Sequence, residues 1–250
     1  MNSIVNVTFL FDILKLTLYI TCAYMALIAC ARYTQTVWLL ALANRRFVAL
    51  GLLTVLVVGI KVFEDVIAQE SGPVDTAMLW FVRQNMPPVL WDFFTAVTVT
   101  GSGIFLAPTT AAVCIGFFIK RHRREAALLA VSMLTAWTCT YTLKALVDRA
   151  RPELWSTAWY WGSSFPSGHT LSTAAFATSL VLGAARIWPR YRNVALVLAV
   201  LWIGLVGLSR LVLGVHWPSD VLAAVCLGVF IPLAISMALD LCMHRATNAP

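Results

Sequence analysis

The stretch SSFPSGHTLSTAAF, residues 163–176, joins a Pro-Ser-Gly-His turn directly to the start of a long apolar run. The run continues to about residue 186, and roughly 20 mostly apolar residues are enough for a helix to cross a bilayer. The turn places a titratable side chain, His169, at the mouth of this apolar helix. Ionisable groups near membrane depth are costly, so a histidine there indicates a functional site at one end of the helix.

Six further apolar runs of similar length accompany this one, at about 8–30, 47–68, 101–119, 126–147, 194–213 and 219–241. Of the 250 residues, 60% are hydrophobic and only 12% are charged, whereas a soluble domain carries about 25% charged residues. The sequence therefore predicts an all-α, polytopic transmembrane bundle of about seven spans. The segment LIAC (27–30) is similar to a lipoprotein cleavage site, but the apolar run is long and no Lys or Arg precedes Asp12. We expect this first run to persist as a helix.

The net charge of +7 is concentrated in short clusters between the apolar runs: Arg45-Arg46, KRHRR at 120–124, and Arg186, Arg190 and Arg192. Clusters of this kind mark cytoplasmic loops, whereas a nucleic-acid partner would need a continuous basic face. The C-terminal end, with His244 and Arg245, is then expected to be cytoplasmic and the N-terminus external. The six cysteines include no CxxC pair, so neither a disulfide framework nor a zinc site is predicted.

The loops that this topology places outside hold few cations, and most of these lie at the outer ends of four helices together with two histidines and an aspartate. These residues are Lys144, Arg149, Arg151, His169, Arg210, His216 and Asp220. Three of the cations, together with a helix start at Ser167 and Gly168, would make a cradle for phosphate, because Arg and backbone amides bind phosphate oxygens well.

The spacing within this set adds detail to the prediction. Lys144 and Arg151 are seven residues apart, about two helical turns, although Pro152 predicts that the helix ends nearby. Asp220 follows His216 by four residues, a spacing that suits a contact between carboxylate and imidazole. Two histidines could supply a nucleophile and a proton donor, whereas carboxylates near them are too few for a magnesium site. Arg149 is off the spacing, and we expect it to be a solvated or headgroup-facing charge.

Loop 69–100 combines an amphipathic stretch, VDTAMLWFVRQNMPP (74–88), with an aromatic one that ends in Gly-Ser-Gly. Trp and Phe collect at membrane interfaces, so an aromatic belt at the headgroups is the favoured interpretation. A groove through which a lipid enters the site is the alternative.

Three spaced motifs in this chain match the pattern of a known family. They are Lys144…Arg151-Pro152, Pro166-Ser167-Gly168-His169 and Ser209-Arg210…His216…Asp220. The chain resembles the type 2 phosphatidic acid phosphatase and haloperoxidase superfamily, whose signature is Lys-x6-Arg-Pro, Pro-Ser-Gly-His and Ser-Arg-x5-His-x3-Asp. The resemblance covers about 47–241.

The resemblance implies specific roles. His216 would be the nucleophile and form a phosphohistidine, Asp220 would orient it, and His169 would protonate the leaving group. Lys144, Arg151 and Arg210 would bind the phosphoryl oxygens, helped by Ser167 and Gly168. Neither a metal nor another cofactor would be needed. Because family members commonly have six spans, residues 1–46 would be an added N-terminal helix and loop, 47–245 the six-helix core and 246–250 a short tail.

The resemblance leaves several alternatives open. Haloperoxidases of the superfamily are soluble, unlike the class predicted here. A transporter or flippase of a phosphorylated lipid would use the same cations without cleaving anything. The sequence does not choose among phosphatidic acid, phosphatidylglycerol phosphate, undecaprenyl diphosphate and lipid A phosphates, nor does it give the oligomeric state. We expect membrane lipids as partners, no nucleic acid, and a location in a bacterial cytoplasmic membrane with the catalytic loops facing outward.

Overall fold

The computed structural model describes residues 2–34, 46–155 and 162–247, with side chains over 14–34, 49–155 and 162–240. These residues belong to two compact units, Met1–Lys61 and Val62–Pro250. The first unit contains α1 (Asn2–Thr34) and most of α3 (Arg46–Ile67). Arg45 lies outside the described residues, as do the side chains of Arg46, His244 and Arg245, so the part of the predicted charge pattern that uses them is not described.

The second unit contains the remaining helices. They are α4 (Gly72–Asn85), α5 (Trp91–Thr100), α6 (Gly103–Ile119), α7 (Arg123–Val147), α8 (Gly168–Ile187), α9 (Arg192–Val212) and α10 (Pro218–Thr247), with 3₁₀ turns η1 (Pro88–Leu90) and η2 (Pro189–Tyr191). The described residues form helices and no strands, which confirms the predicted all-α class.

Five helices within the described residues are long and apolar enough to cross a membrane, and six if a bent pair counts as one span. The bent pair joins 88–100 to 103–119 at an angle of 45°, at the predicted Gly-Ser-Gly break. Helix α3 covers the predicted span 47–68, and its last two turns carry Lys61, Glu64 and Asp65.

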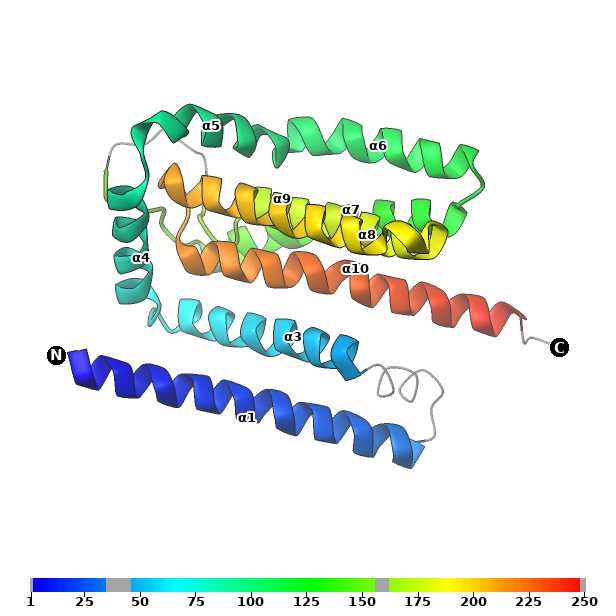
Figure 1. Ribbon diagram of the computed structural model, residues 1–250, viewed down its shortest axis with the longest axis horizontal. Coiled ribbons are helices and arrows are strands. Elements are labelled where there is room, and N and C mark those ends of the chain that lie inside the picture. Colours follow the sequence, from blue (N-terminus) through cyan, green and yellow to red (C-terminus); the bar gives the residue numbers. More distant parts are fainter. Residues whose placement is uncertain (1, 35–45, 156–161, 248–250) are drawn as a thin grey trace. The chain divides into compact units, whose positions relative to one another are not determined.

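Helix α8 is the central element of the second unit, because α7, α9 and α10 all pack against it (Figure 1). Leu171, Ala175 and Phe176 of α8 lie in a buried core with residues of α7 and α10, among them Met133 and Ala224. Small residues let the backbones approach closely, as is common between membrane helices. A Cβ added at Gly228 of α10 would lie only 2.5 Å from the Ala174 Cβ of α8.

The predicted site residues all fall at one end of this bundle. The C-terminal ends of α7 and α9 and the N-terminal ends of α8 and α10 meet there, whereas the basic turns 120–122 and 188–191 connect the opposite ends. Helix α4 runs crosswise to the bundle at the end where α10 begins, and contacts α9 and α10 (Figure 1).

Loop 69–100, predicted as an interfacial segment, forms α4, η1 and α5. One face of α4 is buried through Asp75 and Leu79, while Phe81 on another face is 67% exposed. Arg83 lies 4.2 Å from the ring centroid of Trp91. Exposed aromatic side chains fit the interpretation as a belt, and the lipid-entry groove remains a prediction. The buried Asp75 was not anticipated by either interpretation.

Candidate active site

The first motif spans the end of a helix. Helix α7 ends at Val147, and Asp148 then takes a left-handed conformation with φ 43°. Lys144 therefore lies in the last turn of α7, while Arg151 belongs to the loop that follows, so the two do not share a helical face. The loop folds back instead: Lys144 Nζ donates to the carbonyl of Ser163, and Arg151 Nε donates to that of Gly162 at 3.0 Å.

The second motif forms the start of α8. The Ser167 hydroxyl lies 3.0 Å from that of Thr170, and the Ser167 amide donates to the Asp220 carbonyl at 3.3 Å. A Cβ at Gly168 would lie 3.1 Å from the Thr140 Cγ2 of α7, so the glycine permits close packing of α7 and α8. Since the Ser167 amide is committed to Asp220, an anion at this helix start would meet the amides that follow it.

The third motif carries the most deeply buried polar groups of the site. Arg210 is only 1% exposed, and its Nη1 donates to the Thr98 hydroxyl of α5 at 2.6 Å. His216, which is 2% exposed, lies in the loop between α9 and α10. Its Nδ1 is 3.6 Å from Asp220 Oδ2, slightly longer than a hydrogen bond, and its Nε2 is 3.5 Å from Arg151 Nη1.

The surroundings of His216 favour a neutral imidazole. Burial lowers the pKa of His216 to about 4; the Asp220 carboxylate opposes this change, and the nearby charge of Arg210 adds to it. With Nδ1 facing the carboxylate, the tautomer that fits carries its proton on Nδ1. The lone pair of Nε2 then points to the side where Arg151 lies.

The structure brings the predicted site residues together. Lys144 is close enough to Arg151, Asp220 and Arg210 for their charges to interact. His169 is similarly close to Arg210, His216, Arg151 and Lys144. Arg151 also donates to the Val215 carbonyl at 2.8 Å, which joins the first motif to the third. Three cations, two histidines and a carboxylate therefore form one cluster.

Arg149 was predicted to be a solvated or headgroup-facing charge, and that prediction is wrong. Its side chain is only 16% exposed. It forms ion pairs with Asp75 at 2.7 Å and with Asp220 at 2.6 Å. The reason is that the guanidinium finds two buried carboxylates, and paired charges are far less costly to bury than an isolated one.

Sequence reasoning also missed three residues outside the motifs. Thr98 accepts the hydrogen bond of Arg210, Asp75 accepts that of Arg149, and Gly101 lies where a Cβ would be 3.4 Å from the His169 Cβ. Asp75 could have been singled out as a carboxylate on the inner side of an amphipathic stretch, whereas Thr98 gives no such signal within its aromatic run.

The known proteins similar to this chain include two lipid phosphatases with long matching segments. The chain is 28% identical over 147 residues to phosphatidylglycerophosphatase B of Bacillus subtilis, which covers 58% of this chain and 72% of that protein. It is 35% identical over 128 residues to decaprenylphosphoryl-5-phosphoribose phosphatase of Mycobacterium tuberculosis, covering 46% of this chain and 67% of that protein.

The fold is similar to that in the crystal structure of a transmembrane PAP2 type phosphatidylglycerolphosphate phosphatase from Bacillus subtilis. The TM-score is 0.64 at 24% identity, over 71% of this chain and 93% of that one. The long apolar helices, together with this similarity of fold, indicate that the chain is an integral membrane protein. The model of the PAP2 superfamily matches residues 125–241, which contain all three motifs. This chain therefore belongs to the PAP2 superfamily.

Proposed function

We propose that this protein hydrolyses a phosphate monoester or diphosphate on a membrane lipid through a phosphohistidine intermediate on His216, without a metal ion. Membership of the superfamily and the lipid phosphatases among its relatives support the reaction class. The observation that carries the mechanism is the placement of His216. Its Nδ1 faces Asp220 while its Nε2 lies 3.5 Å from Arg151, so the nucleophilic nitrogen faces the cations that would bind a phosphoryl group.

The first step would transfer the phosphoryl group to the enzyme. Lys144, Arg151 and Arg210 bind the phosphoryl oxygens, and the Nε2 lone pair of His216 forms a bond to phosphorus as the bond to the leaving oxygen breaks. His169 donates a proton to that oxygen. Asp220 stabilises the positive charge that develops on the imidazole, as a carboxylate does in a catalytic triad.

The second step would release phosphate. His169, now neutral, accepts a proton from a water molecule as the water attacks phosphorus and the bond to Nε2 breaks. The described hydrogen-bond acceptors of the three cations include the Ser163, Gly162 and Val215 carbonyls and the Thr98 hydroxyl. These oxygens are neutral, and they fix the positions of the three cationic side chains. Fixed cations can then stabilise the transition state in the place of a metal ion.

The proposed substrate is a lipid, because the site lies at the end of a bundle of membrane-spanning helices. Phosphatidic acid, phosphatidylglycerol phosphate, undecaprenyl diphosphate and lipid A phosphates all present a phosphate at that depth. The site is proposed to face the outside of a bacterial cytoplasmic membrane, since the basic turns at 120–124 and 186–192 lie at the opposite end of the helices.

Activity of the purified protein in detergent tests the reaction. Phosphate release from a panel of these lipids, measured in EDTA, should be abolished by His216→Ala and retained by His122→Ala, a histidine at the opposite end of the bundle. A phosphoryl group from radiolabelled substrate should be trapped on the wild type and not on His216→Ala. Binding of the lipid without release would indicate a transporter, and loss of release in EDTA that Mg²⁺ restores would exclude the metal-independent mechanism.

Labelling of single cysteine variants tests the orientation. Glu153 lies in the loop that follows the first motif and Arg121 lies in a basic turn at the opposite end, and both are exposed. An impermeant thiol reagent added to intact cells should label Glu153→Cys and spare Arg121→Cys, with the unsubstituted protein as a control for its own cysteines. The reverse pattern would place the site inside.

A further inference from the structure

Arg149 lies between two buried carboxylates and donates to both. Its Nη1 donates to Asp220 Oδ1 at 2.6 Å and to the Ser219 hydroxyl at 2.8 Å. Its Nη2 donates to Asp75 Oδ2 at 2.7 Å and to the Ser71 hydroxyl at 2.9 Å. The planar guanidinium therefore clamps the N-terminal part of α4 to the first turn of α10.

Asp75 makes this clamp two-sided. It is 2% exposed and comes from α4, and it accepts hydrogen bonds from the Ser219 amide at 2.8 Å and the Ser219 hydroxyl at 2.6 Å. Asp75 thus holds Arg149 and also holds the residue that directly precedes Asp220. A carboxylate with this many charge-assisted hydrogen bonds is fixed in one orientation.

Asp220 is consequently held on both of its oxygens. Arg149 binds Oδ1, and the Trp217 amide donates to Oδ2 at 2.8 Å. Oδ2 is also the oxygen that lies 3.6 Å from Nδ1 of His216. If Arg149 were removed, the carboxylate would keep only the Trp217 hydrogen bond among those described here and could rotate away from the imidazole.

We propose that Arg149 and Asp75 are positioning residues for the nucleophile, which act by fixing the Asp220 carboxylate against His216. This inference rests on the proposed function of His216. Neither residue belongs to the three motifs, and Asp75 lies outside residues 125–241, which match the superfamily. Helix α4 thereby becomes part of the active-site structure.

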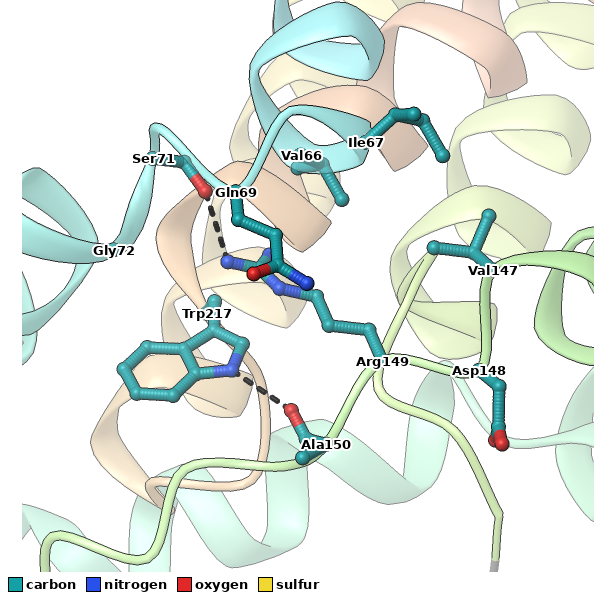
Figure 2. A pocket seen from close by; sticks show the side chains of 10 residues that line it. All are labelled: Val66, Ile67, Gln69, Ser71, Gly72, Val147, Asp148, Arg149, Ala150 and Trp217. Atoms are coloured by element: carbon teal, nitrogen blue, oxygen red, sulfur yellow. Dashed lines mark hydrogen bonds between the residues drawn. The ribbon is translucent and has the colours of Figure 1, made fainter.

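A cavity of about 490 Å³ gives access to this clamp from the side of the α3–α4 connection. Figure 2 shows the Arg149 side chain reaching across it, with Gln69 and Ser71 on one side and Trp217 on the other. The cavity allows a direct experiment, because a small solute can enter the space that a truncated Arg149 side chain would leave.

Steady-state kinetics on phosphatidic acid in detergent test the proposal. Arg149→Ala and Asp75→Asn should each lower kcat by about 10- to 100-fold, the cost of misplacing a reacting group by about 1 Å. KM and the inhibition constant of inorganic phosphate should stay unchanged, because Lys144, Arg151 and Arg210 are untouched. Inhibition by orthovanadate should weaken along with kcat, because its five-coordinate form also needs the His216 nitrogen in place. In an Asp220→Asn background, Arg149→Ala should cost little more, because residues that act through one group are not additive.

Chemical rescue separates positioning from a general loss of structure. Millimolar guanidinium should restore part of kcat to Arg149→Ala and none to Asp75→Asn. Asp148→Asn is the matched control, because Asp148 is an exposed carboxylate that lines the same cavity, and it should behave as wild type. If Arg149→Ala folds poorly, the isosteric Asp75→Asn carries the test.

Two results distinguish the possible failures. An active wild type whose Arg149→Ala and Asp75→Asn variants keep full kcat would overturn the positioning role and leave the proposed function intact. So would a loss of activity that is additive with Asp220→Asn. A wild type that releases phosphate from none of the lipids in the panel would instead overturn the proposed function itself.

Discussion

Gly101 offers a sharp test of how the bend between α5 and α6 is packed against the site. It ends α5 with φ −93°, a conformation open to any residue, so its need for glycine is steric. A Cβ there would lie 2.7 Å from Val206 Cγ1, 2.9 Å from Thr173 Oγ1 and 3.4 Å from the His169 Cβ. The first two distances are too short for real contacts, so Gly101→Ala must displace either α5 or the Val206 and Thr173 side chains that pack against it.

The expected magnitude follows from two opposing effects. Overpacking of a filled site costs about 1–3 kcal/mol, while replacing glycine by alanine gains about 0.4–1 kcal/mol through the unfolded chain. The net loss for Gly101→Ala is on the order of 1–2 kcal/mol, or roughly 2–8 °C in the melting temperature. Since His169 is one of the three neighbours, kcat should also fall.

Gly103 is the matched control, two residues further along the same bend. A Cβ at Gly103 would meet no atom within 4 Å, so Gly103→Ala causes no overpacking. It should only reduce the conformational freedom of the unfolded chain, and the variant should melt at the same temperature as the wild type or slightly higher. Thermal unfolding followed by circular dichroism, together with phosphate release in the same detergent, measures both quantities. If Gly101→Ala matched Gly103→Ala in stability and in kcat, the close packing argued here would be refuted.

Three further outcomes are expected. Thr98→Val should weaken inhibition by inorganic phosphate about tenfold, because it removes a buried hydrogen bond to the charged Arg210, and such a bond contributes about 1.5–3 kcal/mol. Thr95→Val on the exposed side of α5 should change little. The pKa of His216 is lowered to about 4, so its contribution to stability is complete above about pH 6.5 and is lost as the pH falls towards 4; melting temperatures over this range should fall less for His216→Asn than for wild type. Orthovanadate, which can take the five-coordinate geometry of the transition state, should inhibit phosphate release more strongly than phosphate does, and EDTA should not inhibit it.

The parts of the site that were predictable from the sequence are those encoded within short stretches of chain. His216 and Asp220 are four residues apart, and the structure places them 3.6 Å from each other across the start of α10. The alternation of spans also placed the motifs at one end of the bundle, because successive helices joined by short turns run in opposite directions. Helical spacing predicted that Lys144 and Arg151 would share one face of a helix, but α7 ends at Val147, between the two residues. The loop that follows α7 brings Arg151 to the Val215 carbonyl instead.

The parts that the sequence could not give depend on contacts between distant segments. Arg149 and Asp75 are 74 residues apart, and Arg210 and Thr98 are 112 residues apart. No periodicity or motif connects such positions in a single sequence, because their proximity results from how α4 and α5 pack against α9 and α10. Thr98 and Asp75 therefore looked like ordinary members of an aromatic and an amphipathic segment.

The acceptors of each cation explain why Arg149 differs from its neighbours. In the hydrogen bonds described here, Lys144 and Arg151 donate to backbone carbonyls, which orient the two side chains and carry no charge of their own. Arg149 donates to two carboxylates, which neutralise it. A phosphoryl group at Arg149 would have to displace a buried carboxylate and leave it unpaired, at a cost of several kcal/mol. Arg149 is therefore better suited to holding the Asp220 carboxylate in place than to binding a phosphoryl group.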